Sequence, residues 1–146
     1  MPGQLYDWTC SACSLEWVKR STGLIAPPDD IYASRQTTVA EIGYPDHINP
    51  QVGLTDASGS ALQSVLELYG QETSQSWLDF DTVYDLAQGT TGMLSGAAWY
   101  RWVALRGVQG SNLLIANSAP GYKGVYDVLS PYDFQRLGGF SVVWLV

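Results

Sequence analysis

The sequence is poor in basic residues, cysteine and histidine, and it has no long apolar run. Its 146 residues include 7 Lys and Arg against 14 Asp and Glu, a net charge of −7, and the basic residues are scattered. A protein that binds nucleic acid through phosphates needs a basic cluster, so this class is excluded. No run approaches the roughly 18 apolar residues of a membrane helix. We therefore expect no nucleic-acid partner and no membrane span.

The amino terminus also lacks a targeting signal. The stretch "MPGQLYDW" has neither the basic region nor the apolar segment of a signal peptide. The localisation stays open between the compartment of synthesis, export as part of a larger assembly, and a place in a virus particle. The chain is long enough, and at 46% hydrophobic content apolar enough, to form one core, so we expect a single domain over residues 1–146.

Cysteine and histidine are too few for a structural zinc site. The chain has only Cys10, Cys13 and His47, whereas such a site normally needs four ligands. A thioredoxin-like pair needs a preceding strand, and "MPGQLYDWT" is a poor one. The simplest alternative is a buried Cys13 that packs as a small apolar residue, with Cys10 semi-exposed.

Other cofactor signals are absent as well. There is no glycine-rich phosphate loop and no serine nucleophile elbow. The segment "DFDTVYD" places Asp79, Asp81 and Asp85 close together, but it lacks the glycine and glutamate of a calcium loop. Acidic residues favour a helix start, so we interpret these three as a solvated helix N-terminus. We expect neither a cofactor nor a metal.

The residues that are present predict helices first and strands afterwards. Apolar spacing and capping residues predict helices over 11–21, 36–43, 57–70 and 80–89, with Thr37 or Thr38 and Ser58 as caps. Short β-prone segments follow over 92–99, 100–108, 112–118, 124–130 and 140–146. "VQGSN" predicts a hairpin, and "SPYDFQRLGG" predicts a helix capped by Ser130. This order predicts an α+β domain with an antiparallel sheet.

One cysteine stands where a thiol has a chemical reason to be reactive. Cys10 immediately precedes the first predicted helix, in "QLYDWTCSACSLEW". The N-terminus of a helix offers free N–H groups and a positive dipole end, and both lower the pKa of a thiol. Gln4 lies six residues before it, and much later come the segments "WYRWVALRG", "LLIANSAPG" and "SPYDFQRL" and an apolar terminal strand.

This order of motifs, over nearly the whole chain, resembles the papain-like bacteriocin-processing peptidases, the double-glycine leader peptidases of export transporters. It is also similar to their relatives in bacteriophage lysins and virions. The resemblance implies a papain-like fold with N-terminal helices packed on a C-terminal antiparallel sheet. It implies Gln4 at the oxyanion position, Cys10 as the nucleophile, and Asn117 as the residue that orients the base. The position of the family's histidine falls on Arg101.

Arginine cannot replace histidine in peptide cleavage. The leaving amine must receive a proton, and arginine, with a pKa above about 12, does not release one. We therefore interpret the chain as a degenerate peptidase domain that serves as a binding or structural module, for a peptide, a cell-wall fragment or a protein partner. The plentiful tryptophans and tyrosines either fill a small core, the role we favour for the set as a whole, or line a groove that stacks against peptide or sugar. The candidate cleft or interface aromatics are Trp8, Trp17, Trp99, Tyr100 and Trp102.

Two alternatives remain at this point. The first is an active cysteine peptidase that cleaves a leader peptide or a cell-wall cross-link, with Cys10 attacking and His47 a possible base supplied from a loop. The second is a purely structural protein, such as a component of a viral particle, whose cleft is filled by its own side chains. Both keep the same fold, and fold alone does not decide among them.

Overall fold

The computed structural model describes residues 10–23, 31–43, 58–96, 101–117, 125–136 and 139–146. Five residues singled out above lie outside these ranges: Gln4, Trp8, His47, Trp99 and Tyr100. In the described part of the chain, no helix is long and apolar enough to cross a membrane.

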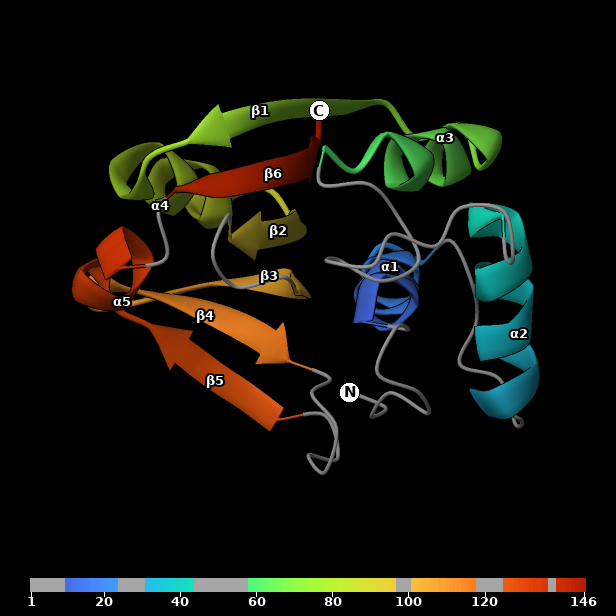
Figure 1. Ribbon diagram of the computed structural model, residues 1–146, viewed down its shortest axis with the longest axis horizontal. Helices are drawn as coiled ribbons and strands as arrows, with labels where there is room; N and C mark the ends of the chain where they lie inside the picture. The colour runs from blue at the N-terminus through green and yellow to red at the C-terminus, as the bar shows by residue number, and fades with distance from the viewer. Residues whose placement is uncertain (1–9, 24–30, 44–57, 97–100, 118–124, 137–138) are drawn as a thin grey trace.

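Six strands form one antiparallel sheet. They are β1 (Thr73–Leu78), β2 (Gly92–Gly96), β3 (Trp102–Gln109), β4 (Asn112–Asn117), β5 (Val125–Leu129) and β6 (Phe140–Leu145). Their order across the sheet is β1-β6-β2-β3-β4-β5, and every neighbouring pair is antiparallel. The last strand of the chain therefore lies near one edge, between β1 and β2, and joins the two halves of the sequence (Figure 1). The predicted α+β class is confirmed.

Helices cover both faces of this sheet. The helices α1 (Cys10–Ser21), α2 (Ile31–Ile42) and α3 (Ser60–Leu68) lie on one side, and α4 (Phe80–Gly89) and α5 (Pro131–Arg136) lie on the other (Figure 1). Side chains alternate along a strand, so each inner strand serves two cores. Met93 contributes to the core under α1 to α3, while Leu94 contributes to the core under α4 and α5.

Local sequence signals located most of these elements. The helix predicted over 80–89 is α4, and its N-cap is Asp79, whose carboxylate accepts a hydrogen bond from the Thr82 backbone at 3.0 Å. Ser130 caps α5 by accepting from the backbone N–H of Asp133 at 3.1 Å. The predicted hairpin joins β3 to β4 through two residues, and Gly110 has the positive φ of 60° that this tight turn favours.

Three details differ from the sequence prediction. Helix α2 begins at Ile31, five residues before the predicted start. Helix α3 begins at Ser60, and its N-cap is Gly59 rather than Ser58. Strand β1 was not predicted, because its sequence "TSQSWL" is mostly polar and has no apolar alternation. Pairing with β6 along all six of its residues makes it a strand.

A buried cation ties the three helices of one face together. Lys19 on α1 is 1% exposed, and its Nζ donates to Glu41 at 2.7 Å and to Thr38 at 3.2 Å, both on α2. The hydroxyl of Tyr69, just after α3, donates to the second carboxylate oxygen of Glu41, Oε2, at 2.7 Å. The ammonium also lies 4.6 Å from the centre of the Tyr69 ring. Every charge in this cluster is paired, as burial requires.

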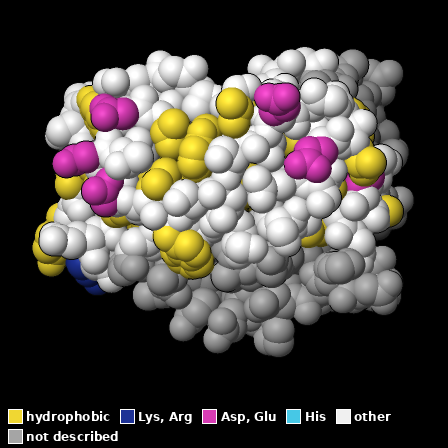
Figure 2. All heavy atoms as spheres, turned by 90° about the horizontal axis from the view of Figure 1, so that it is seen from above, with side chains coloured by type: hydrophobic (Ala, Val, Ile, Leu, Met, Phe, Trp, Pro, Cys, Tyr) yellow, Lys and Arg dark blue, Asp and Glu magenta, His cyan; other side chains and the backbone are white. Residues whose placement is uncertain are grey.

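The surface reflects the acidic composition. Seen from above, the face over the β1 edge carries separate carboxylates and apolar side chains, with basic side chains visible only at one margin (Figure 2). The large apolar side chains that are exposed among the described residues are Leu68, Trp77, Val128, Tyr132 and Val146. No basic face appears in this view, which agrees with the scattered basic residues of the sequence.

The close approach at Gly59 leads to a first prediction. A Cβ at Gly59 would lie 2.7 Å from Val143 and 2.8 Å from Trp102, both in the core, whereas a Cβ at Gly70 would meet nothing within 4 Å. Both glycines have positive φ, 75° and 76°. Gly70→Ala therefore measures the backbone strain alone. We expect Gly59→Ala to cost about 1–3 kcal/mol more in urea unfolding, through overpacking. Equal losses in the two variants would contradict the observed packing.

The buried ion pair leads to a second prediction. Glu41→Leu leaves the ammonium of Lys19 buried without its carboxylate, and we expect a loss of about 3–5 kcal/mol in the free energy of unfolding. The double variant Lys19→Met/Glu41→Leu removes both charges and should recover most of that loss. Denaturant titration of the single and double variants measures the difference. A double variant no more stable than Glu41→Leu would show that the unpaired ammonium of Lys19 is not the cause of the loss.

Candidate functional site

Helix α1 places the candidate thiol in the interior. The helix begins at Cys10 and packs against both β3 and α2, so its first two turns are buried on nearly every side. Cys10 and Cys13 are 3% and 1% exposed, and neither forms a disulfide. The interpretation of Cys13 as buried is confirmed. The semi-exposed Cys10 of the same interpretation is wrong, because β3 covers it.

The sulfur of Cys10 accepts a hydrogen bond from the sheet. The backbone N–H of Trp102, the first residue of β3, donates to Sγ with an N–S distance of 3.4 Å. Burial raises the pKa of the Cys10 thiol, and the N–H of Trp102 and the positive charge of Arg101 offset this only in part. Desolvation opposes the charged form more strongly than the neighbouring dipoles support it. At neutral pH the group is therefore a thiol, and a thiol is a weak nucleophile.

Arg101 and Asn117 meet at the same end of the sheet. Because β3 and β4 are antiparallel, with Ala104 opposite Ala116, the start of β3 and the end of β4 are neighbours. Arg101 directly precedes β3, and its Nη1 donates to Oδ1 of Asn117, the last residue of β4, at 3.2 Å. The charge of Arg101 acts on the thiol of Cys10. The structure thus brings Cys10, Arg101 and Asn117 together, while Gln4 lies outside the described residues.

The aromatic candidates divide into two groups. The side chain of Trp102 is 0% exposed and belongs to the core beneath α1, with no hydrogen-bond partner for its Nε1 within the described structure. This position does not agree with the expectation of a ring that faces a ligand. Trp17 is partly buried and packs against the same core. Trp8, Trp99 and Tyr100 lie outside the described residues.

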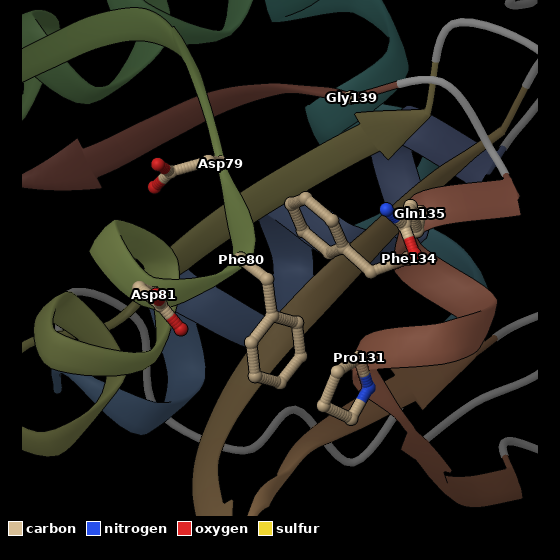
Figure 3. Close-up of a pocket in the computed structure, with 7 residues that line it drawn as sticks. All are labelled: Asp79, Phe80, Asp81, Pro131, Phe134, Gln135 and Gly139. Carbon is tan, nitrogen blue, oxygen red and sulfur yellow. The ribbon is translucent and has the colours of Figure 1, made fainter.

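A cavity that the sequence did not indicate lies between α4 and α5. Its volume is about 420 Å³, and its lining consists of Asp79, Phe80, Asp81, Pro131, Phe134, Gln135 and Gly139 (Figure 3). No local motif could reveal it, because two helices about fifty residues apart in the sequence build it. Its carboxylate Asp79 is engaged as the cap of α4, bonded to the Thr82 hydroxyl at 2.6 Å, and this bonding lowers the pKa of Asp79. The interpretation as a helix start is confirmed for Asp79, the N-cap, and for Asp81, in the first turn, whereas Asp85 lies beyond the first turn of α4.

Of Cys10, Arg101 and Asn117, only Arg101 carries a charge near neutral pH, and none of the three transfers protons there. The Cys10 thiol is protonated, since burial raises its pKa. A guanidinium stays charged at every physiological pH, and an asparagine amide does not titrate. Histidine, the usual proton carrier in this pH range, is absent from the described ranges, since the one histidine of the chain is His47.

Comparison with known proteins identifies the fold. The sequence matches no protein-family model and no curated protein significantly. A double-glycine-motif protease from an AMS/PCAT transporter, solved in complex with the leader peptide, is similar with a TM-score of 0.70 and 15% identity, over 98% of this chain and 88% of that chain. The peptidase domain of Streptococcus ComA, a bifunctional ABC transporter involved in quorum sensing, is similar with a TM-score of 0.69 and 17% identity, over 99% and 96% of the two chains. A Bacillus anthracis protein described as a C39-like peptidase has a TM-score of 0.64 and 14% identity, over 100% and 93%. The chain therefore has the papain-like fold of the C39 double-glycine peptidase domains.

Proposed function

We propose that this protein is a degenerate peptidase domain, one unit over residues 1–146, that binds a peptide without cleaving it. The observation that carries the proposal is the hydrogen bond from Arg101 to Asn117 beside Cys10. At this place the family resemblance implies a histidine held by an asparagine or aspartate. Peptide is the ligand class we favour, because one solved protein of the same fold holds a leader peptide.

The chemistry of amide cleavage supports the loss of turnover. A nucleophilic thiol needs a base to activate it and an acid to protonate the departing amine. Removal of a general acid–base group typically costs about 10²–10⁴ in rate. The loss is larger where nucleophile and base act as a unit. Arg101 supplies charge to this site but no proton transfer.

The buried thiol supports the same conclusion independently. In a cysteine peptidase the thiolate is the attacking species, so a depressed pKa and partial exposure are needed. Cys10 has the opposite combination, a raised pKa and 3% exposure. The helix N-terminus and the neighbouring cation remain, yet they do not outweigh desolvation.

A second candidate function is an active cysteine peptidase. The observation that favours it is the place of Cys10 at the start of α1, where the Trp102 N–H meets the sulfur. In that reading Gln4 stabilises the oxyanion, Asn117 orients a base, and His47 is brought in to act as that base. The two functions predict opposite results in the following experiments.

Thiol reactivity is the first of these. In a Cys13→Ala background, where Cys10 is the only thiol, we expect iodoacetamide to alkylate the folded protein many-fold more slowly than the urea-unfolded protein at pH 7–8. Because the pKa of Cys10 is raised, the rate should keep increasing above the ordinary thiol pKa of about 8.5. Mass spectrometry of quenched samples gives the rate. Fast labelling at pH 6–7 would instead indicate a stabilised thiolate and favour the peptidase.

Turnover is tested with a fluorescent peptide that contains a double-glycine site. We expect fluorescence anisotropy to report binding, with the same affinity in the wild type and Cys10→Ala, and chromatography to find no product above background in either. The Cys13→Ala variant serves as a matched control for loss of a buried sulfur. Product that forms with the wild type and Cys13→Ala, but not with Cys10→Ala, would contradict the non-cleaving function and show that the protein is an active cysteine peptidase.

A further inference from the structure

Arg101 is a partly buried cation whose charge no described residue neutralises. Its guanidinium has five N–H donors, and the hydrogen bond to Asn117 uses one of them. The ion pairs within the described ranges are Lys19 with Glu41 and Arg20 with Glu16, so no described carboxylate lies within ion-pair distance of Arg101. A partly buried charge without a counter-charge costs free energy that an incoming anion would recover.

The partner of Arg101 orients the guanidinium without cancelling its charge. Asn117 accepts from Nη1 through its amide oxygen at 3.2 Å, and an amide is neutral. The guanidinium is thereby held at the start of β3, and among the described residues only Asn117 accepts a hydrogen bond from it. Its planar fork matches the two oxygens of a carboxylate, which it can bind through paired, charge-assisted hydrogen bonds.

The position of this cation suggests which carboxylate it meets. A thiol peptidase attacks the carbonyl carbon of the scissile bond, and hydrolysis turns that carbon into the C-terminal carboxylate of the released peptide. In this fold the sulfur of Cys10 marks that place, and the charge of Arg101 acts on this sulfur. A bound peptide that runs in the direction of a peptidase substrate, but ends beside Cys10, would present its terminal carboxylate to Arg101.

On the basis of the proposed peptide-binding function, we propose that the site takes the free C-terminal carboxylate of a peptide, with the Arg101 guanidinium as its binding group beside Cys10 and Asn117. The site would then hold peptides of the product type rather than peptides that continue past it. Arg101 is the specificity-determining residue, and no bond is formed or broken.

Two synthetic peptides of identical sequence test this inference, each ending in Gly-Gly, one with a free carboxylate and one with a C-terminal amide. Calorimetry at low salt and neutral pH should show the acid binding about 10- to 100-fold more tightly, as expected for hydrogen bonds to a charged group. Arg101→Gln should lower the affinity of the free-acid peptide to that of the amide peptide. Arg101→Lys should keep part of the preference for the free acid. Added salt should narrow the gap between the two peptides.

Arg106→Gln is the matched control, since Arg106 is an exposed arginine on the same strand and its loss changes the net charge equally. It should keep the full preference for the acid. Competition with acetate separates a peptide terminus from a free small carboxylate: acetate that displaces the acid peptide at matched concentration would overturn the peptide assignment. If Arg101→Gln does not fold, the affinities of the free-acid and amide peptides for the wild type still test whether the site binds a free carboxylate.

The remaining outcomes separate this inference from the function it rests on. Equal affinity of acid and amide for the wild type would overturn the carboxylate site and leave peptide binding standing. No measurable binding of either peptide would contradict both. Cleavage of the amide peptide that depends on Cys10 would overturn the non-cleaving function, whatever the preference between the two peptides.

Discussion

The packing of α1 between the sheet and α2 is the constraint on which the site depends. It fixes the start of α1 against the first residue of β3, so that the sulfur of Cys10 receives the Trp102 N–H. At the other end of the helix, the ammonium of Lys19 bonds to Glu41 across to α2. One end of α1 is thus held by the sheet and the other by a buried ion pair. A shift of α1 would separate the thiol from Arg101.

The same packing explains why a site built for a reactive thiol holds an unreactive one. A helix N-terminus and a nearby cation each favour a thiolate. Both act on Cys10, but the enclosure that positions the sulfur also removes its water. An adjacent imidazolium, lysine or arginine can offset the desolvation of a thiolate when it lies directly against the sulfur. At Cys10 the backbone N–H of Trp102 and the guanidinium of Arg101 do not offset the desolvation of the thiolate.

The sequence predicted what local signals control and missed what tertiary contacts control. Ser130 before Pro131 located α5, and the glycine of "VQGSN" located the β3–β4 turn, since caps and turns act within a few residues. Strand β1 is polar and exists because β6 pairs with it. The burial of Cys10 and Trp102 likewise depends on segments some ninety residues apart, which periodicity does not report. Only the family resemblance linked Cys10, Arg101 and Asn117 beforehand, together with Gln4, which lies outside the described residues. The antiparallel β3–β4 pair explains why Arg101 and Asn117 meet.

The pairing of arginine with asparagine, rather than with aspartate, gives this site its character. A guanidinium against an aspartate would form a neutral, self-satisfied ion pair, with little left for a ligand. Against Asn117 the same guanidinium is held in place and keeps its full charge. Its charge is also constant across the physiological pH range, whereas that of a histidine is not. A position that transfers protons in a peptidase is thereby suited to steady attraction of an anion.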